Sequence, residues 1–358
     1  MLTGKRIVIT GGTGSLGSVL VRRLLSGTMG LPEAVTVFSR DEAKQHAMRL
    51  SYQRLESATD EVIYHNFERL LRFQIGDVRD YASVTSVLRD ADIVFNAAAL
   101  KQVPTCEYFP WEAVKTNIAG PENIVRAIRD GKLDVQTVIG ISTDKAVKPV
   151  NVMGMTKAIQ ERIFIRGNLE CPGTRFVCAR YGNVLASRGS VIPLFHHQIG
   201  FGGPVTITTL DMTRFLLSLE EAVDTILAAL EHGHPGETYI PRVPSARVVD
   251  IAKALVGDRP IETIVTGIRP GEKVHEILVS EEESHLTVAR DPYYVILPLL
   301  PELRPDPLDV PMLEREYSSR DDVMSLQTLT DFLARHKLLL DHELVLEEDM
   351  LALSLIHI

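Results

Sequence analysis

Residues 5–17 read Lys-Arg-Ile-Val-Ile-Thr-Gly-Gly-Thr-Gly-Ser-Leu-Gly, an apolar strand pattern that passes directly into a glycine-rich turn. An amphipathic helix is predicted to follow this turn and to end near Ser26. Glycines allow the backbone to turn tightly and to approach a pyrophosphate, whose charge the amides of the helix N-terminus would meet. A glycine-rich match alone is weak evidence, but its place between a strand and a helix indicates dinucleotide binding. The residues predicted to make these contacts are Gly11, Thr13, Gly14, Ser15, Leu16 and Gly17.

Strand and helix patterns alternate from residue 5 to residue 141, as is typical of a doubly wound parallel sheet. The alternation stops after a strand at 175–180, where short polar segments punctuated by Gly and Pro begin. We therefore predict an α/β fold with a Rossmann-type, NADP-binding sheet domain at 1–182, to which a helix at 216–232 returns. A smaller substrate-binding α/β domain is predicted mainly at 183–340, and residues 341–358 have no pattern that we interpret. The other expected strands of the sheet lie at 34–38, 73–75, 92–96 and 135–141, and the main expected helices at 41–55, 106–130 and 153–166.

The composition argues against several classes of protein. A net charge of −9 argues against a broad basic face that binds nucleic acid or an anionic membrane. The three cysteines show no metal-ligand spacing, so we predict no metal site and a reducing compartment. No apolar run approaches the ~20 residues of a membrane helix, and the first strand begins too early to leave room for a signal peptide. These features together predict a cytoplasmic protein.

The strand at 34–38 ends in Ser39-Arg40-Asp41, the region that selects between NAD and NADP. A site for NAD usually places a carboxylate here to bind the ribose hydroxyls. The first polar residues are instead Ser39 and Arg40, and Lys44 follows one turn into the next helix. This combination suits a 2′-phosphate and favours NADP. In the alternative, Arg40 is a surface charge, Asp41 binds the ribose and the cofactor is NAD.

The next two strands also end in residues that suit a cofactor. Asp77 is placed to contact an adenine ring, although a role as the N-cap of the next helix is equally physical. The small residues that follow the strand at 92–96 would let the chain pass close to a flat cofactor. Lys101, just beyond them, faces either the active site or the solvent. The remaining predicted cofactor contacts are Val78, Ala97, Ala98, Ala99 and Asn117.

Three polar residues, Thr143, Asp144 and Lys145, lie just past the carboxyl end of the buried strand at 135–141. In open α/β sheets, ligands bind at the carboxyl ends of the strands. An Asp beside a Lys in a partly dry cleft can form an acid and base pair, because burial moves the two pKa values in opposite directions. The alternative is a solvated Asp-Lys turn with no chemical role.

Taken together, these motifs resemble the extended short-chain dehydrogenase/reductase superfamily over about residues 3–340. More narrowly, the chain is similar to the nucleotide-sugar 4,6-dehydratases that act on UDP-N-acetylglucosamine in capsule, O-antigen and flagellin-glycan biosynthesis. The resemblance implies a homo-oligomeric lyase that keeps NADP bound and takes UDP-N-acetylglucosamine or a related UDP-N-acetylhexosamine. The motifs that carry it are Thr-Gly-Gly-Thr-Gly-Ser-Leu-Gly at 10–17, Ser-Arg-Asp-Glu at 39–42, Gly-Asp-Val-Arg-Asp at 76–80, Ala-Ala-Ala-Leu-Lys at 97–101, Ser-Thr-Asp-Lys at 142–145, Arg-Tyr-Gly-Asn-Val at 180–184 and Arg-Pro-Gly-Glu-Lys at 269–273.

The chain departs from the superfamily at its Tyr-x-x-x-Lys motif, which here begins with Met153 and ends with Lys157. Residues four apart share one helix face, and the ammonium of the lysine normally lowers the pKa of the phenol so that it accepts a hydroxyl proton. Methionine cannot act in this way. Methionine at this position resembles the inverting dehydratases that begin UDP-N-acetyl-L-fucosamine synthesis. The group that deprotonates the C4 hydroxyl is left open, with water or Lys145 as candidates.

The resemblance also implies roles for individual residues. Asp144 is the acid at the C6 hydroxyl, Lys145 is the base at C5, Thr143 bonds the C4 oxygen and Lys157 holds the nicotinamide ribose. On the nucleotide side, Glu272 would contact the uridine ribose, and Val205, Thr206 and Ile207 would lie along the uracil. The diphosphate is assigned to Asn183, Arg214 and Arg269, and Lys101 and Arg188 complete the predicted substrate contacts.

Two other functions remain open from the sequence. A UDP-sugar 4-epimerase has the same fold and cofactor, but it needs neither an acid at C6 nor a base at C5, so Asp144 and Lys145 argue against it. A catalytically silent NADP-binding sensor would explain the missing tyrosine. Such a sensor would have no reason to keep Asp144, Lys145 and the arginines together.

Overall fold

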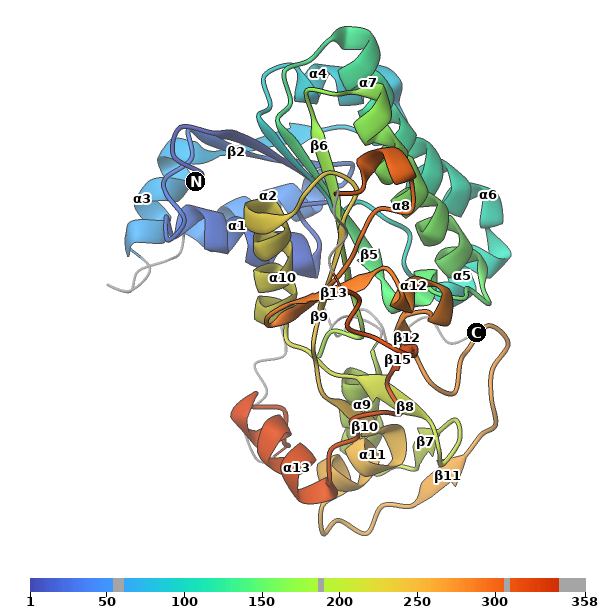
Figure 1. The fold of residues 1–358 in the computed structure, drawn as a ribbon. Helices are drawn as coiled ribbons and strands as arrows, with labels where there is room; N and C mark the ends of the chain where they lie inside the picture. Colours follow the sequence, from blue (N-terminus) through green and yellow to red (C-terminus); the bar gives the residue numbers. More distant parts are fainter. Residues whose placement is uncertain (54–60, 186–189, 306–309, 341–358) are drawn as a thin grey trace. The chain divides into compact units, whose positions relative to one another are not determined.

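The computed structural model describes residues 1–53, 61–185, 190–305 and 310–340, and it divides the chain into two compact units (Figure 1). Unit 1 consists of Met1–Tyr181, Leu219–Arg242 and Ile277–Tyr317. Unit 2 consists of Gly182–Ser218, Val243–Glu276 and Ser318–Ile358, of which the described part ends at residue 340. The chain therefore passes between the units several times.

Within the described residues, unit 1 is built on a nine-stranded sheet with the order β13-β14-β9-β6-β5-β4-β1-β2-β3. The strands from β3 to β6 are parallel, and β9 joins them as a parallel neighbour of β6. The chain runs outward from β1 to β3 and then returns to β4 on the other side of β1, so the sheet is doubly wound. The strands are β1 Arg6–Thr10, β2 Ala34–Ser39, β3 Leu71–Ile75, β4 Ile93–Asn96, β5 Thr137–Thr143, β6 Arg175–Tyr181, β9 Thr238–Pro241, β13 Thr287–Arg290 and β14 Tyr293–Ile296.

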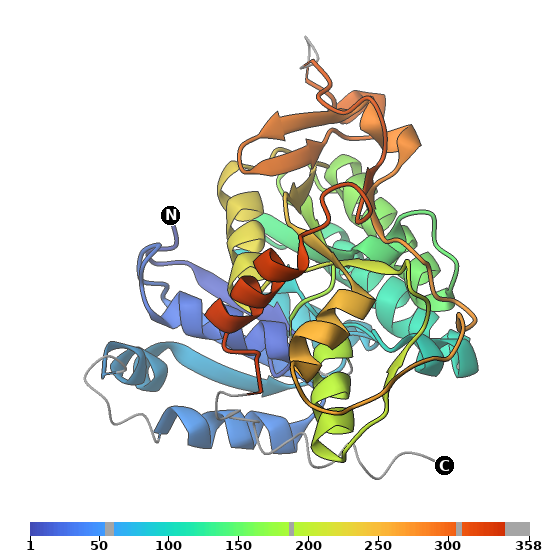
Figure 2. The same ribbon diagram turned by 90° about the horizontal axis from the view of Figure 1, so that it is seen from below.

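Helices cover both faces of this sheet. On one face α1 packs against α3 and α10, and on the other α7 packs against α4 and α8 (Figures 1 and 2). The predicted Rossmann-type α/β fold is therefore confirmed. The helices of unit 1 are α1 Ser15–Leu25, α2 Glu42–Gln53, α3 Glu61–Leu70, α4 Tyr81–Leu88, α5 Val103–Tyr108, α6 Pro110–Val114, α7 Gly120–Gly131, α8 Val152–Glu170, α10 Leu219–His232 and α12 Glu281–Ser284, with short turns η1 Lys115–Ala119, η2 Asp144–Ala146 and η3 Pro301–Leu303.

The core of unit 1 forms where α8 lies against β5 and β6. Phe164 of α8 is fully buried, and its ring stacks on Phe176 of β6 with the centroids 6.1 Å apart. A Cβ on Gly140 would lie 2.4 Å from the ring of Phe164, so the glycine leaves the space that this ring occupies. Burying a phenylalanine contributes about 1.5–3 kcal/mol to folding. The packing therefore holds α8 at a short distance from β5.

A buried ion-pair network fixes the same helix one turn before Phe164. Arg180 of β6 donates two hydrogen bonds to Glu161 of α8, at 2.9 and 2.7 Å, and two to Glu283 of α12, both 2.8 Å. It also donates to the carbonyl of Leu278 at 2.9 Å. Leu278 lies in β12 (Ile277–Val279), which packs against η2. Arg180 therefore links α8 to the segment that supports the turn after β5.

The described residues of unit 2 form a core of their own and two small sheets. β7 (Val205–Ile207) pairs in parallel with β11 (Thr263–Val265), and β8 (Thr213–Phe215) pairs antiparallel with β10 (Ser245–Arg247). The core is formed by residues such as Phe195, Ile251 and Leu329. These residues come from the helices α9 Val191–Gly200, α11 Val248–Val256 and α13 Leu326–Arg335.

Two features of the fold differ from the sequence prediction. The helical region expected at 106–130 is broken into α5, α6, η1 and α7, because Pro110 provides no amide to continue α5. Residues 277–317 were assigned with the substrate domain but belong to unit 1. The reason is that β14 pairs antiparallel with β9, and β13 with β14, so the segment extends the large sheet. The two-residue strand β15, Tyr317–Ser318, follows it.

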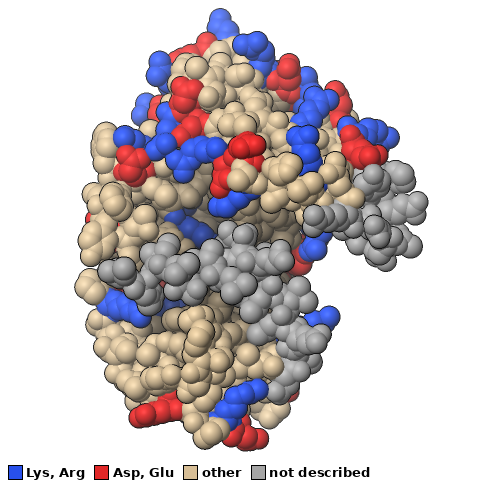
Figure 3. Space-filling model, turned by 180° about the vertical axis from the view of Figure 1, so that it is seen from behind, with Lys and Arg blue, Asp and Glu red and all other residues tan. Residues whose placement is uncertain are grey.

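Three further features concern membrane spans, metal clusters and surface charge. Among the described residues, no helix is both long and apolar enough to cross a membrane. The same part of the chain contains no cluster of three or more His, Cys, Asp or Glu side chains that could hold a metal ion. On the face shown in Figure 3, basic and acidic side chains are interspersed over the described surface.

The packing of α8 predicts a large difference between two substitutions on one helix. Phe164→Ala should destabilise the protein by about 3–5 kcal/mol, because it empties a buried site. Leu169→Ala, at a position that is 44% exposed, should change stability by less than about 0.5 kcal/mol. The denaturant midpoint of each variant measures the effect. Equal shifts for the two variants would contradict the packing described for Phe164.

The Arg180 network predicts a pH-dependent stability. Burial raises the pKa of Glu283, but the charge and hydrogen bonds of Arg180 outweigh it and lower the pKa to about 2, from an ordinary value of 4.5. A carboxylate whose pKa is lower in the folded state stabilises the fold above pH 4.5, and this stabilisation is lost as the pH falls towards 2. Glu283→Gln should therefore cost roughly 3 kcal/mol near neutral pH, and the difference from wild type should shrink below about pH 4.5.

The measurement is the denaturant midpoint of wild type and variant from about pH 7 to about pH 3. Glu281→Gln, an exposed carboxylate on the same short helix, is the matched control and should change little at any pH. Parallel pH curves for wild type and Glu283→Gln would show that the carboxylate of Glu283 does not stabilise the fold.

Candidate functional site

The turn between β1 and α1 has the shape that a pyrophosphate requires. Gly11 has a φ of +67°, and a Cβ at this position would lie 2.8 Å from the backbone of Ala98. A Cβ on Gly17 would lie 2.6 Å from the backbone of Gly12. The N-cap of α1 is Gly14, and no side chain caps the first amides of the helix. The turn therefore presents backbone amides and leaves room for an anionic group.

The end of β4 is tied to this turn. The hydroxyl of Thr10 donates to Asn96 Oδ1 at 2.8 Å and accepts from the amide of Ala98 at 3.3 Å, while the amide of Ala97 donates to the carbonyl of Thr10 at 3.1 Å. These bonds hold Ala97 and Ala98 beside the glycine turn, at the switch point between β1 and β4. Ala99, the third predicted alanine, is exposed.

The residues after β2 bring two cations to the edge of the sheet. The side chains of Arg40 and Lys44 are each about half exposed. The hydroxyl of Ser39 accepts a hydrogen bond from Gln45 at 3.0 Å. Asp41 accepts the backbone amide of Lys44 at 3.0 Å, which lowers the pKa of its carboxyl, and lies 3.3 Å from Lys44 Nζ. The carboxylate of Asp41 therefore binds Lys44 at the start of α2.

Asp77 does not cap the helix that follows it. The N-cap of α4 is Asp80, whose carboxylate accepts the amide of Ser83 at 2.9 Å, so the N-cap alternative for Asp77 is wrong. Asp77 instead accepts two hydrogen bonds from Arg79, one from its amide at 2.9 Å and one from Nε at 2.8 Å. Burial raises the pKa of Asp77, but these bonds outweigh it and lower the pKa. Arg40 Nη1 lies 3.7 Å from the same carboxylate.

Two predicted cofactor contacts have side chains that face the protein. Asn117 is fully buried, accepts the amide of Leu100 at 2.8 Å, and donates to the carbonyl of Leu100 at 2.9 Å and to Thr156 at 3.0 Å. It therefore clamps the loop after β4 to α8. The side chain of Val78 belongs to the sheet core, so only its backbone could face a cofactor. Lys101 is exposed on the loop that Asn117 holds.

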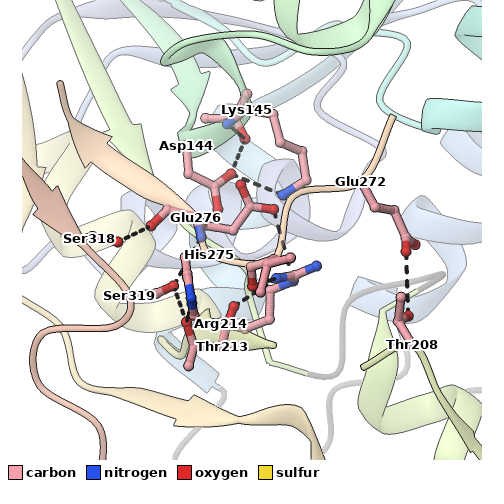
Figure 4. A network of polar contacts seen from close by, with 12 residues as sticks. Asp144, Lys145, Thr208, Thr213, Arg214, Glu272, His275, Glu276, Ser318 and Ser319 are labelled. Atoms are coloured by element: carbon pink, nitrogen blue, oxygen red, sulfur yellow. Dashed lines mark hydrogen bonds and ion pairs between the residues drawn. The ribbon is translucent and has the colours of Figure 1, made fainter. Parts of the chain in front are cut away.

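As predicted, the three polar residues lie together at the end of a strand: β5 ends at Thr143 and η2 begins with Asp144 and Lys145. Figure 4 shows the side chains of Asp144 and Lys145 pointing toward each other. Asp144 is completely buried, and its Oδ1 accepts hydrogen bonds from Thr143 Oγ1 at 2.7 Å and from Lys145 Nζ at 3.0 Å. The side chain of Lys145 keeps 21% of its surface exposed. The alternative of a solvated Asp-Lys turn is therefore wrong. A buried carboxylate in contact with an ammonium group can exchange protons with a reacting molecule.

The start of α8 presses closely against this turn. Asn151 caps the helix by accepting the amide of Gly154 at 2.8 Å. A Cβ on Gly154 would lie 2.1 Å from the carbonyl oxygen of Lys145, so glycine is required for the close approach. Met153, at the place of the superfamily tyrosine, is buried in a small apolar cluster with Cys106 and Ala113.

Lys157 is held inside the protein. Its Nζ donates to the carbonyl of Ile141 at 2.5 Å and to Gln160 Oε1 at 2.6 Å. Burial lowers the pKa of Lys157 to about 8, although the charge of Glu161 opposes this shift. Gln160 also donates to the carbonyl of Ile141 at 2.9 Å. The sequence prediction missed Gln160, whose spacing of three residues from Lys157 on the helix was the available signal.

The predicted nucleotide contacts lie in unit 2 and differ in exposure. Arg214 on β8 is mostly buried, and its Nη1 donates to the carbonyls of Thr213 at 2.7 Å and Val274 at 3.1 Å. Arg269 is exposed. Asn183 Oδ1 is buried without a hydrogen-bond partner among the described residues. Arg188 lies outside the described residues.

The stretch predicted to lie along a uracil is mostly core. The side chains of Val205 and Ile207 are buried in the core of unit 2, so only Thr206 and the backbone of β7 can face a ligand. Beyond β7, the hydroxyl of Thr208 lies 3.4 Å from Glu272 Oε2 (Figure 4).

The sequence prediction missed a chain of polar contacts around Arg214. The hydroxyl of Thr213 lies 2.8 Å from His275 Nδ1 and 2.6 Å from Ser319 Oγ, and Ser319 accepts the amide of Glu276 at 3.0 Å (Figure 4). His275 also lines an open pocket of about 660 Å³ in unit 2. Its position two residues after the Arg-Pro-Gly-Glu-Lys motif was the only signal in the sequence.

Comparisons with known proteins show which family the chain belongs to. Residues 7–298 match the model of the family described as polysaccharide biosynthesis protein. The chain is 46% identical over 288 residues to the UDP-glucose 4-epimerase of Rickettsia conorii (strain ATCC VR-613 / Malish 7), covering 79% of this chain and 80% of that protein. The UDP-glucose 4-epimerase of Rickettsia typhi (strain ATCC VR-144 / Wilmington) is 44% identical over 289 residues with the same coverage.

The solved structures agree with this assignment. The X-ray structure of Pen from Bacillus thuringiensis matches with a TM-score of 0.83 and 30% sequence identity. The match covers 95% of this chain and 100% of that chain. The dTDP-glucose 4,6-dehydratase DesIV from Streptomyces venezuelae, solved with NAD and TYD bound, shares only the fold, at 21% identity and a TM-score of 0.62 over 75% of this chain and 86% of that chain. The chain therefore belongs to the polysaccharide biosynthesis protein family of extended short-chain dehydrogenases/reductases, as an NAD(P)-dependent enzyme that modifies nucleotide sugars.

Proposed function

We propose that the protein is a UDP-N-acetylglucosamine 4,6-dehydratase that forms a 4-keto-6-deoxy sugar nucleotide with inversion at C5. The observation that carries this proposal is the fully buried carboxylate of Asp144 in contact with Lys145 at the end of β5. A hydroxyl on an unactivated carbon is a poor leaving group. Its removal requires an acid at the leaving oxygen and a base at the neighbouring carbon, and this pair supplies one of each.

The cofactor fits the residues of unit 1. The glycine turn has no room for side chains, and the amides of α1 have no side-chain cap, which suits a pyrophosphate. Ser39 and the exposed cations Arg40 and Lys44 suit a 2′-phosphate, so we favour NADP over NAD. A bound nicotinamide cofactor would supply the hydride acceptor for C4 and would later return that hydride to the sugar. A C4 ketone acidifies the proton on C5, which makes the elimination feasible.

The proposed roles follow the positions of the side chains. Lys145, partly exposed, releases a proton to solvent and as the neutral amine removes the proton from C5, and Asp144 in its protonated form gives a proton to the departing C6 hydroxyl. Thr143, whose hydroxyl lies at the end of β5, bonds the C4 oxygen. Inversion at C5 rests on Met153, because methionine at this position resembles the inverting branch of the dehydratases. Lys157 supports the nicotinamide ribose.

The nucleotide end of the substrate is assigned to unit 2. Arg214, anchored by two carbonyls, and the exposed Arg269 supply the positive charge that a diphosphate requires. The orphaned buried oxygen of Asn183 is the kind of acceptor that a ligand completes. Glu272 is proposed to bind the uridine ribose, and Thr206 with the backbone of β7 is proposed to bind the uracil.

A UDP-sugar 4-epimerase is the second candidate, and the comparisons favour it more directly than the dehydratase. The curated relatives at 44–46% identity carry the name UDP-glucose 4-epimerase. Oxidation at C4 is common to both reactions, and an epimerase then returns the hydride to C4 from the other face. The buried acid beside a lysine would have no role at C5 or C6 in that reaction, which is why we place the dehydratase first.

Proton NMR of UDP-N-acetylglucosamine incubated with the enzyme in D₂O should distinguish the two. The dehydratase is expected to produce a new C6 methyl signal, deuterium at C5 and the couplings of an L-arabino ring. Asp144→Asn should lower the rate of methyl formation about 10²–10⁴-fold, because it removes the acid.

Asp134→Asn, at an exposed position, is the control and should leave the rate unchanged. A methyl signal with the original configuration at C5 would exclude inversion only. Interconversion at C4 without any methyl signal would overturn the dehydratase in favour of the epimerase.

A further inference from the structure

The oxidation of C4 requires a base, and the two residues at the superfamily positions do not supply one. Met153 has no titratable group, and its thioether lies in an apolar cluster. Lys157 is 95% buried and donates hydrogen bonds to the carbonyl of Ile141 and to Gln160. An ammonium that is donating to two acceptors has no lone pair with which to accept a proton.

The Thr143–Asp144 pair at the end of β5 offers an alternative base. The hydroxyl of Thr143 donates to Asp144 Oδ1 at 2.7 Å, a distance typical of a strong charge-assisted hydrogen bond. An ionised carboxylate only accepts, so the proton of this bond belongs to Thr143. One lone pair of Thr143 Oγ1 accepts the backbone amide of Lys145 at 3.4 Å, and the other is the acceptor that a sugar hydroxyl would meet. Thr143 itself is half-buried at the carboxyl end of β5.

We infer that Thr143 and Asp144 form a proton relay that takes the place of the missing tyrosine in the oxidation of C4. This inference rests on the proposed function only in requiring oxidation at C4, which the dehydratase and the epimerase share. The residues that carry it are a hydroxyl and a buried carboxylate already joined by a hydrogen bond. Lys145 contacts the same carboxylate oxygen at 3.0 Å and stabilises its ionised form before the reaction.

The step is balanced in protons and electrons. The C4 hydroxyl gives its proton to Thr143 Oγ1 as Thr143 gives its own proton to Asp144 Oδ1. The electron pair of the C4–H bond leaves as a hydride to the nicotinamide, and the C4–O bond becomes a carbonyl. Asp144 ends the step as a neutral carboxylic acid. That is the form needed to protonate the C6 hydroxyl in a dehydratase, or to return the proton to O4 in an epimerase.

A substrate analogue separates this relay from the role of Asp144 at C6. UDP-N-acetylglucosamine with hydrogen in place of the C6 hydroxyl can be oxidised at C4 but cannot undergo elimination. Single-turnover fluorescence of the reduced nicotinamide measures the oxidation alone. If Asp144 accepts the C4 proton, Asp144→Asn should slow this oxidation about 10²–10⁴-fold. If Asp144 acts only on the C6 hydroxyl, the variant should oxidise the analogue at the wild-type rate, which would overturn the relay.

Substitutions of Thr143 test the first half of the relay. Thr143→Val keeps the shape but removes the hydroxyl, and it should slow the oxidation by a similar factor. Thr143→Ser keeps the hydroxyl and should restore most of the rate. Equal rates for the Val and Ser variants would overturn the role of Thr143. Melting temperatures of the variants identify losses that come from unfolding, and Asp134→Asn serves again as the surface control.

Infrared spectroscopy gives a readout that does not depend on rate. After oxidation of the analogue by the wild-type protein, the relay predicts the carbonyl-stretch band of a protonated carboxyl group, absent from Asp144→Asn. Oxidation without such a band would show that the proton went to solvent and would overturn the relay. Formation of a C4 epimer from the natural substrate with the relay results intact would overturn only the proposed dehydratase.

Discussion

The close approach between Gly154 and the carbonyl of Lys145 sets the geometry on which the site depends. A side chain at position 154 would place a Cβ 2.1 Å from that carbonyl, so any other residue would push α8 away from the turn after β5. The contact fixes the start of α8, and Phe164 packed over Gly140 fixes its middle. Glu161, bound by Arg180, ties the helix to β6. A helix held at three points leaves the turn that carries Asp144 little freedom to shift.

The replacement of the tyrosine by Met153 changes the chemistry more than the packing. A methionine fills irregular apolar space well, and Met153 packs with Cys106 and Ala113. A phenol at this position would also have to accommodate its polar hydroxyl. Another group within reach of C4 must then accept the hydroxyl proton that the phenol would otherwise take. Thr143 and Asp144 already share a short hydrogen bond. This consideration applies equally to a dehydratase and to a 4-epimerase, so the naming of the curated relatives does not affect it.

The sequence was sufficient for the features that depend on local pattern. The strand, the glycine turn and the helix of residues 5–25 were predictable because spacing and residue type act over a few positions. The placement of Thr143 to Lys145 at a strand end followed from the same logic. Partners that are distant in the sequence were not predictable: β14 pairs with β9, and Arg180 binds Glu283, which lies 103 residues further along the chain. Asn117 was predicted to contact the cofactor, but its side chain binds Leu100 and Thr156. These partners were not predictable because they also lie far from Asn117 in the sequence.

The hydrogen bonds of Lys157 explain why the chain keeps this lysine although its usual phenol partner is missing. Burying an ammonium is costly unless its protons are bonded, and here the carbonyl of Ile141 and the amide oxygen of Gln160 accept them. Glu161, one turn further along α8, favours the charged form. Because Ile141 lies in β5 two residues before Thr143, the lysine ties α8 to the strand that ends in the proposed relay. Its retention follows from this structural contact, and the contact does not require a tyrosine at position 153.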